Sequence, residues 1–562
     1  MMQPFSTDPK LNPFYYLDYL DYLLAFVSKR YEQVLKDAER ERLQTFQALP
    51  KPARALYTRL LQRKGDYFRV DRLTYPEIPA LGTAVKKLIT AGFLQPIDGA
   101  RQDLWLSLRT VKELKQLSVL APLGLSNASR VQIEQAVVQA AVELPDLEIV
   151  CVREQTLMAL CQHLFFGNEY QDLSEFVLSD LGLQQFEPVD LSLRPAFTAR
   201  DDLDLLRLIG KFRQWAKTLE RDSLALKRVP DAAGQIQFIT ALTTLTEMVP
   251  DASEHPLVLR ALNKLHLSLG RIHERSGLAN AALRCYQKSD LAAALMRQAR
   301  LQIKTAPDAA LSLCKTILKT SNDPEARHYA ERVLRAHHEA LSKEEASAPT
   351  PIRIEHLSVR LDTVTRVEQR VIAHFAEQGL VAVHIENHLY PALLGLLFWE
   401  VIFTPISGAF HHPFQRGPAD LDEADFVQRR AASFAQRFDV LSTLSQRQHQ
   451  LRHCFKEKFG LANPFVHWSV IELPGLLFVL NHTSWPALSA IFHRILQSPK
   501  KFRTGFPDLL VFHAAHYELI EVKGPGDRLQ THQTAWLRFL SAQGVQVSVL
   551  NVANTDDLAK AP

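Results

Sequence analysis

The spacing of apolar and polar positions predicts a chain that is mainly helical up to about residue 340 and mixed α/β afterwards. Residues 14–48 place apolar groups at helical spacing and predict one or two amphipathic helices. Residues 166–340 predict helix after helix, with few strand-like alternations. Near the C-terminus, the apolar runs 508–513 and 517–523 predict the two strands of a hairpin. An amphipathic helix and an alternating strand follow them.

A small unit with the outline of a winged helix is predicted near the N-terminus. The segment 51–72 carries seven basic residues against two acidic ones, a surplus of five positive charges. The segment 78–98 then predicts a helix that ends at Gly92 and a short apolar strand. This order of elements is the one expected of a winged-helix-like unit.

The basic residues of this unit alternate with the aromatic residues Tyr57, Tyr67 and Phe68. Cationic side chains bind backbone phosphates and aromatic rings stack on bases, so the mixture indicates nucleic-acid binding. The candidate DNA-binding residues here are Arg59, Arg63 and Lys64. A solvated helix face would carry similar charges and is the alternative interpretation.

Residues 104–143 have the outline of a SAP-like helix–loop–helix. The loop contains Gly124, Ser126 and Asn127, and a second helix follows. Any helical hairpin shares this outline, so the pattern alone does not distinguish the two.

One segment of the helical region, 267–289, resembles a tetratricopeptide repeat (TPR), and degenerate neighbours follow it. The residues at the positions of the repeat are Leu269, Gly270, Gly277, Ala282 and Tyr286. Ordinary helix packing is the alternative. The segment 342–351 is small, charged and Pro-containing, which is typical of a linker.

We therefore expect a multidomain, mainly α protein with three parts. Residues 1–165 form the helical, winged-helix-like and SAP-like DNA-binding region. Residues 166–350 form a TPR-like helical domain, and residues 351–562 form an α/β domain.

The composition excludes several classes of protein. Lys+Arg 65 against Asp+Glu 61 gives a net charge of +4, which is too small to indicate a nucleic-acid partner by total charge. Five scattered cysteines without a CxxC pair argue against a disulfide scaffold and a zinc finger, and they suit a reducing cytosol. The N-terminus lacks the pattern of a secretory signal. The most apolar stretch, 390–403, contains Pro391 and Glu400 and predicts a buried helix, not a membrane span.

The predicted hairpin carries the candidate chemistry. Side chains alternate along a strand, so Glu521 and Lys523 share a face, and Asp508 opens the partner strand. Two carboxylates and the main-chain carbonyl of Val522 can hold a hard divalent cation, and Lys523 can orient or help deprotonate a water. This arrangement suits phosphodiester hydrolysis. The alternative is that Asp508 caps a strand and Glu521 forms an ordinary ion pair with Lys523.

Three motifs in order resemble one family of nucleases. The pattern Pro507-Asp508, Glu521-x-Lys523, then 524–529 and Gln533 resembles the VRR-NUC nuclease domain. The segment 386–403 (ENHLYPALLGLLFWEVIF) resembles the Fanconi-associated nuclease 1 family. The segment 56–78 (LYTRLLQRKGDYFRVDRLTYPEI), with AGFLQ behind it, does so too. The eukaryotic members of the family carry a zinc finger. This chain lacks the cysteines for one, so we expect a bacterial member.

The resemblance implies the site residues and their roles. It implies a restriction-endonuclease-like fold for the C-terminal domain, with catalytic residues Asp508, Glu521 and Lys523. Glu386 is implied as a further metal carboxylate beside Asp508, Glu521 and the Val522 carbonyl. The implied cofactor is Mg²⁺ or Mn²⁺.

A second basic segment, 498–505, comes immediately before Asp508. Its cations Lys500, Lys501 and Arg503 suit DNA phosphates or a 5′ terminal phosphate. His532 stands where the family pattern leads us to expect a lysine. Glu400 lies in an apolar run and is expected to have a buried partner, not a metal, and His411 and His412 are interpreted as structural or surface residues.

The resemblance further implies a structure-specific DNA endonuclease that cuts near 5′ flaps or branches, with 5′ to 3′ exonuclease activity, in interstrand crosslink repair. The expected partner is branched or flap DNA, with no membrane contact, a monomeric state and a bacterial cytoplasmic location. Four-way junction resolution is an alternative. A non-catalytic helical-repeat scaffold is another, although the intact Glu386, Asp508, Glu521 and Lys523 count against it.

Overall fold

The chain folds into two compact units in a computed structural model. Unit 1 is formed mainly by the chain up to Phe186, and unit 2 mainly by the chain from Ala199 onwards. The structure describes residues 12–97, 102–116, 124, 127–139, 146–168, 171–182, 184–192, 195–229, 231–321, 323–337, 352–359 and 366–555. The predicted linker 342–351 lies outside these residues, and the three-domain division stays a prediction.

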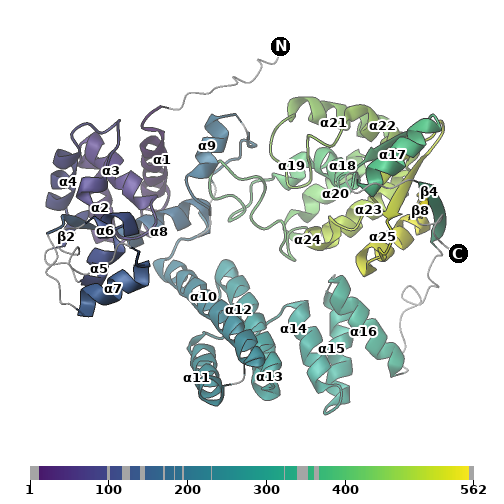
Figure 1. The fold of residues 1–562 in the computed structure, drawn as a ribbon. Helices are drawn as coiled ribbons and strands as arrows, with labels where there is room; N and C mark the ends of the chain where they lie inside the picture. The colour runs from purple at the N-terminus through teal and green to yellow at the C-terminus, as the bar shows by residue number, and fades with distance from the viewer. Residues whose placement is uncertain are drawn as a thin grey trace. The chain divides into compact units, whose positions relative to one another are not determined.

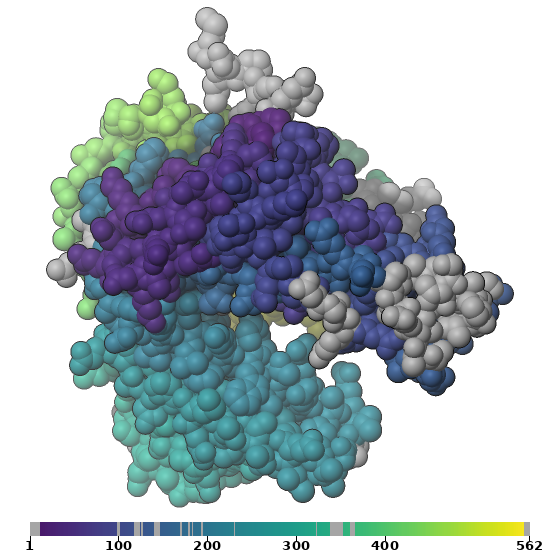
Figure 2. Space-filling model, turned by 90° about the vertical axis from the view of Figure 1, so that its left-hand side faces the viewer, coloured from purple at the N-terminus to yellow at the C-terminus, as the bar shows by residue number. Residues whose placement is uncertain are grey.

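Unit 1 combines helices with a small antiparallel sheet, and Figure 2 shows part of its surface in purple and blue. Its elements are α1 (Tyr15–Arg30), α2 (Asp37–Ala48), α3 (Lys51–Leu61), β1 (Tyr67–Arg69), α4 (Leu81–Thr90), β2 (Leu94–Ile97), α5 (Gln102–Ser107), α6 (Val111–Lys115), α7 (Arg130–Gln139), β3 (Ile149–Val152), α8 (Gln155–Phe166) and α9 (Ser174–Asp180).

The winged-helix-like part of unit 1 has an aromatic core. Phe46, Tyr57 and Phe93 pack with ring centroids 5.2–5.5 Å apart. Helix α4 ends before Gly92, whose φ of +74° suits a residue without a Cβ, and β2 follows as predicted. The sheet has the order β1-β3-β2, so its central strand comes from residues 149–152, outside the segment from which the unit was predicted.

The SAP-like segment is described only in part. Helices α5 and α6 precede the loop, α7 follows it, and Trp105, Leu114 and Ile133 belong to one buried cluster. The predicted first helix is interrupted by Thr110, which caps α6 by accepting a hydrogen bond from Glu113 N. Ser126, a predicted loop residue, lies outside the described residues.

Unit 2 begins with a helical array and continues into a five-stranded sheet with its covering helices (Figure 1). Its elements are α10 (Arg200–Arg228), α11 (Ala232–Met248), α12 (Pro256–Arg275), α13 (Ala279–Gln287), α14 (Ala292–Gln302), α15 (Pro307–Thr320), α16 (Pro324–Ala336), β4 (Arg353–Val359), α17 (Val367–Glu377), β5 (Val381–His384), α18 (Leu389–Leu397), α19 (Trp399–Ile402), α20 (Ala431–Val440), α21 (Leu444–Glu457), α22 (Leu473–His482), α23 (Trp485–Gln497), α24 (Pro499–Phe502), β6 (Leu509–Phe512), β7 (Tyr517–Lys523), α25 (Thr531–Ala542) and β8 (Val547–Asn554).

The TPR-like segment forms the helix pair α12–α13. Gly277 turns the chain between the two helices with φ +78°. Gly270 lies against the ring of Tyr286, where a Cβ on residue 270 would come within 2.4 Å of the ring. The small residue therefore allows the close approach of the two helices, as the repeat pattern predicts.

The sheet of unit 2 has the order β4-β8-β7-β6-β5. Strand β6 runs antiparallel to both β5 and β7, and the β6–β7 hairpin is the one predicted from the sequence. Side chains of β7 alternate: Ile520 and Val522 pack with Val371 of α17, whereas Leu519 belongs to the cluster on the other face. By the same alternation, Glu521 and Lys523 share the face of Leu519.

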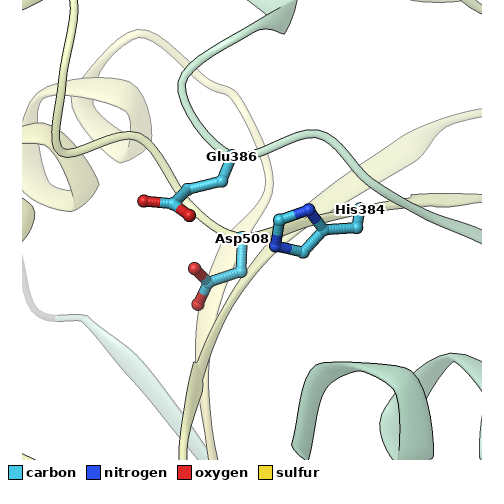
Figure 3. Close-up of side chains that lie close together, drawn as sticks. All are labelled: His384, Glu386 and Asp508. Atoms are coloured by element: carbon cyan, nitrogen blue, oxygen red, sulfur yellow. The ribbon is translucent and has the colours of Figure 1, made fainter. Parts of the chain in front are cut away.

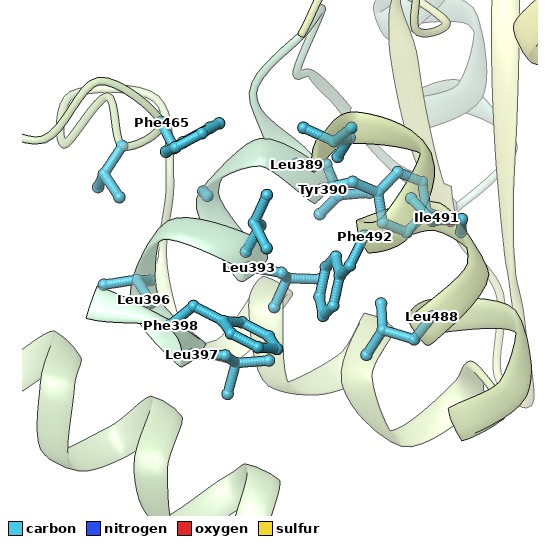
Figure 4. Close-up of a cluster of buried hydrophobic side chains, with 14 of the residues drawn as sticks. Leu389, Tyr390, Leu393, Leu396, Leu397, Phe398, Phe465, Leu488, Ile491 and Phe492 are labelled. Carbon is cyan, nitrogen blue, oxygen red and sulfur yellow. The ribbon is translucent and has the colours of Figure 1, made fainter. Parts of the chain in front are cut away.

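Helices α18 and α23 contribute to the large apolar core of unit 2 (Figure 4). Leu393, Phe398 and Phe492 are fully buried there. The predicted buried helix 390–403 is divided at Phe398 into α18 and the short α19. None of the helices within the described ranges has the length and apolarity that crossing a membrane requires.

Candidate active site

Neighbouring strand ends place acidic side chains at one end of the sheet. Strand β6 begins directly after Asp508, and its Leu509 lies opposite Ile520 of β7. Asp508 is therefore next to Glu521 on the adjacent strand. On the other side, Ile385 N, just beyond β5, donates a hydrogen bond to Asp508 O at 2.9 Å. Backbone pairing thus brings segments about 120 residues apart in the chain to one place.

His384, Glu386 and Asp508 form a group whose ligand atoms lie within 4.8 Å of one another. Figure 3 shows their side chains side by side: His384 at the end of β5, Glu386 on the chain that follows it, and Asp508 directly before β6. Glu386 therefore lies where the resemblance places it, beside Asp508. His384 was not among the residues predicted from the sequence. The spacing His384-x-Glu386 at the end of an apolar strand is the signal that could have revealed it.

Asp508 is almost buried, with 9% of its surface exposed. Its Oδ2 accepts a hydrogen bond from Val522 N at 2.8 Å. Burial raises the pKa of Asp508, the hydrogen bond from Val522 opposes this, and the nearby Glu386 adds to the rise. N–H and C=O of one strand residue point to the same side, so the carbonyl of Val522 also faces the side of Asp508.

Glu521 is 1% exposed, and its two oxygens differ in their contacts. Oε1 accepts hydrogen bonds from Lys523 Nζ and from Gln533 Nε2, both at 2.6 Å. Oε2 is buried and has no hydrogen-bond partner within the described residues. Burial, then the charge of Asp508, raises the pKa of Glu521 to about 7.

These residues fit a divalent cation. Glu386 and Asp508 lie close together, and Glu521 is next to Asp508 on the adjacent strand. The positive charge of Lys523 opposes the rise in the pKa values of Asp508 and Glu521. A buried carboxylate oxygen without a partner is costly unless a cation or a donor reaches it. Oxygen ligands of this kind are the ones that Mg²⁺ and Mn²⁺ take.

Asn387 links two parts of the site. Its Nδ2 donates to Glu386 Oε1 at 3.0 Å, and its Oδ1 accepts from Gly505 N at 2.7 Å and Phe506 N at 3.1 Å. Its φ is +60°, a left-handed conformation that asparagine tolerates better than most residues. Asn387 therefore ties Glu386 to the chain that leads into Asp508.

Two family models match segments near the two ends of the chain. The "FAN1, HTH domain" family model matches residues 14–95, and the "VRR-NUC domain" family model matches residues 443–554. The Fanconi-associated nuclease 1 homolog of Pseudomonas aeruginosa is 32% identical, over 98% of this chain and 97% of that protein. The chain belongs to the Fanconi-associated nuclease 1 family.

The human relative is longer than this chain. The human Fanconi-associated nuclease 1 is 23% identical, over 96% of this chain but only 62% of its own length. The crystal structure of paFAN1 bound to 2-nucleotide 5′ flap DNA with a gap is similar throughout. It has a TM-score of 0.79 and 29% identity, and the match covers 97% of this chain and 99% of that one.

The second basic segment includes α24, and its three cations differ in their exposure and contacts. Lys500 is exposed. Lys501 forms an ion pair with Asp323 of the helical array. Arg503 donates to the carbonyls of Pro499 and Pro464 and to Asp422, at 3.0–3.4 Å. Of the three cations, Lys500 is therefore the one whose binding to a phosphate is least restricted by its contacts in the structure.

The basic residues in the family's HTH match also differ. Arg59 is paired with Glu77 at 2.7 Å and lies 3.8 Å from the Tyr16 ring centroid. Arg63 and Lys64 are exposed. Tyr57, predicted as a stacking residue, is fully buried and donates its hydroxyl to Arg153 O, so it cannot stack on a base.

The other acidic and histidine residues named from the sequence have different surroundings. Glu400 is exposed and pairs with Arg437 at 2.8 Å, so it has an ionic partner but not a buried one. His411 and His412 are buried, and burial lowers their pKa values to about 4 and about 3. His532 lies against Gly505, near Asn387.

Proposed function

We propose that this chain is a metal-dependent, structure-specific DNA nuclease that cleaves phosphodiester bonds near 5′ flaps and branches. The observation that carries the proposal is the buried pair Asp508 and Glu521 with Lys523 at 2.6 Å from Glu521. The names of the relatives and the flap DNA bound by paFAN1 support the choice of substrate. We extend the proposal to 5′ to 3′ exonuclease activity and to interstrand crosslink repair.

The proposed metal site consists of Glu386, Asp508, Glu521 and the carbonyl of Val522. A divalent cation, Mg²⁺ or Mn²⁺, supplies Lewis-acid stabilisation of the charge on the scissile phosphate when it is bound there. Val522 N restrains Asp508 through its Oδ2, and Gln533 restrains Glu521 through its Oε1. Within the described residues, Glu521 Oε2 has no hydrogen-bond partner and could bind the cation. Asn387 restrains Glu386.

Lys523 is the proposed proton-handling group. Its side chain is 12% exposed and is held by Glu521 Oε1, so the ammonium stays next to Glu521 and close enough to Asp508 to interact with its charge. From this position it can donate a hydrogen bond to an attacking water or to a phosphate oxygen. Either role acts on the chemical step and not on the affinity for DNA.

The DNA-binding residues in the proposal are Arg59, Arg63 and Lys64 in unit 1, and Lys500, Lys501 and Arg503 in and directly after α24. The exposed Arg63, Lys64 and Lys500 are the ones we expect to contact phosphate directly. Arg59, Lys501 and Arg503 would have to share or exchange their present partners to do so.

The experiment that tests the proposed function uses end-labelled 5′ flap, 3′ flap, four-way junction and plain duplex DNA, each with and without divalent cation. We expect cation-dependent cutting near the 5′ flap junction and weaker cutting of the other substrates. Cutting of the four-way junction alone would favour a resolvase. No cutting of any substrate with Mg²⁺ or Mn²⁺ would favour the non-catalytic scaffold.

A further inference from the structure

His384 lies at the acidic centre on the edge strand of the sheet. It is the last residue of β5, directly opposite Leu509, and the residue after it bonds to the main chain of Asp508. Its position relative to Asp508 is therefore set by strand pairing and not by a free loop. The side chain is exposed, so an ion or water can reach it.

The ligand atoms of His384, Glu386 and Asp508 lie close enough together to bind one ion. A ring nitrogen of His384 and one oxygen each of Glu386 and Asp508 lie within 4.8 Å of one another (Figure 3). Metal–ligand bonds of about 2.0–2.2 Å bring ligand atoms to within about 4 Å of each other. Small side-chain rotations would therefore suffice to place all three atoms on one cation.

A second observation points to a cation at this place. Glu521 Oε2 is buried without a hydrogen-bond partner in the part of the chain that the structure describes. The side chain is 1% exposed, and the charges of Asp508 and Glu386 both act on it. Lys523 is held by the other oxygen of Glu521. An unpartnered, buried carboxylate oxygen therefore lies on the strand next to Asp508, although Glu521 itself is not one of the three residues whose ligand atoms lie within 4.8 Å of one another.

We propose that His384 is a nitrogen ligand of the divalent cation bound by Glu386 and Asp508, and that it makes the site prefer Mn²⁺ to Mg²⁺. This inference rests on the proposed metal-dependent function and specifies its cofactor. Mg²⁺ takes oxygen ligands almost exclusively, whereas imidazole nitrogen binds first-row transition ions. Without His384, the carboxylates and the Val522 carbonyl would offer only oxygen ligands, which both ions accept.

Pulsed EPR of Mn²⁺ bound to the full chain tests this directly, because a coordinated nitrogen gives a ¹⁴N hyperfine coupling. The variants are His384→Asn, the control His388→Asn, and Asp508→Asn. His388 is a suitable control because it is close enough to interact with both Glu386 and His384. Its ring, however, packs with the ring of His467, with 5.0 Å between the two ring centroids. Mn²⁺ and Mg²⁺ dissociation constants are measured for the same proteins.

We expect the ¹⁴N coupling in wild type and His388→Asn and its absence in His384→Asn. The Mn²⁺ dissociation constant of His384→Asn should rise at least about tenfold, since even residues that only support a ligand change affinity about 10–100-fold. The Mg²⁺ constant should change by less than about threefold, because Mg²⁺ relies on the oxygen ligands.

Two outcomes overturn different statements. Mn²⁺ binding that depends on Asp508 but shows no ¹⁴N coupling in wild type, or a coupling that survives in His384→Asn, overturns the role of His384 and leaves the proposed function standing. Mn²⁺ binding that is unchanged in Asp508→Asn overturns the metal site, and with it the proposed function.

Discussion

Gln533 donates a hydrogen bond from Nε2 to Glu521 Oε1, with 2.6 Å between the two atoms. Gln533 is itself fixed, because its Oε1 accepts from the backbone of Gln530 at the start of α25. Together with Lys523, this bond occupies one oxygen of Glu521 and leaves the other for a cation. Helix α25, which follows the hairpin, therefore determines which oxygen of the buried Glu521 carboxylate is available to a cation.

The first prediction concerns this bond. We expect Gln533→Ala to lower the single-turnover cleavage rate and to weaken Mn²⁺ binding, because Glu521 is then less restrained. The free energy of unfolding should fall by about 1–3 kcal/mol, the usual cost of removing a hydrogen bond to a charged group. Thr531→Ala, an exposed change in the same helical turn, is the control for cleavage, ion titration and denaturant unfolding. Equal behaviour of the two variants would contradict the role of Gln533.

The second prediction concerns pH. The pKa of Glu521 is about 7 in the folded chain against 4.5 ordinarily, so the folded state binds a proton that the unfolded state releases. The contribution of Glu521 to the free energy of unfolding is complete below about pH 4.5 and is lost as the pH rises through about 7. The Tm of the ion-free protein should therefore fall with rising pH more steeply than that of Glu521→Gln. Thermal melts in chelator measure this, and parallel curves for the two proteins would refute it.

A third prediction separates two kinds of basic residue in unit 1. Arg63→Gln with Lys64→Gln should weaken duplex binding and reduce the slope of affinity against salt by about 0.9 for each phosphate that is no longer neutralised. Arg59→Gln should instead lower stability, because it leaves Glu77 without its ion-pair partner and removes the cation from the Tyr16 ring. Salt-dependent binding and thermal melts of both variants distinguish these effects. An unchanged salt slope in the double variant would show that this face does not touch phosphate.

The fourth prediction compares Lys500 with Arg503. Lys500→Ala should reduce cleavage of a flap that carries a 5′ phosphate more than cleavage of the same flap without it, and should blur the cut position. Arg503→Ala should lower stability and affect both substrates alike, because the guanidinium holds Pro464, Pro499 and Asp422. Single-turnover assays on the matched pair of flaps provide the measurement. A phosphate-dependent defect in Arg503→Ala alone would reverse the two assignments.

The parts of the site that are local in sequence were predictable. The hairpin that carries Asp508, Glu521 and Lys523 follows from two apolar runs and a period of two. The turn at Gly277 and the close packing of Gly270 on Tyr286 follow from the repeat spacing. In each case a short pattern determines both the element and the face on which the side chain lies.

Several contacts that depend on distant pairing were not predicted from the pattern of apolar and polar positions. His384 joins the carboxylates only because β5 pairs with β6, and Asn387 reaches Gly505 only across that pairing. The central strand β3 completes a sheet whose other strands are far away in the chain. Tyr57 shows the opposite error: an aromatic residue beside cations suggested stacking, but the helix buries it in the core.

The central claim is that Asp508 and its neighbours cut DNA and do not merely bind it. The most direct test is single-turnover cleavage of a 5′-labelled flap by Asp508→Asn, together with its dissociation constant for the same flap without divalent cation. We expect cleavage to fall by at least about a hundredfold and DNA affinity to stay within about threefold. Cleavage by Asp508→Asn at the wild-type rate would contradict the account, because the carboxylate would then have no part in the chemistry.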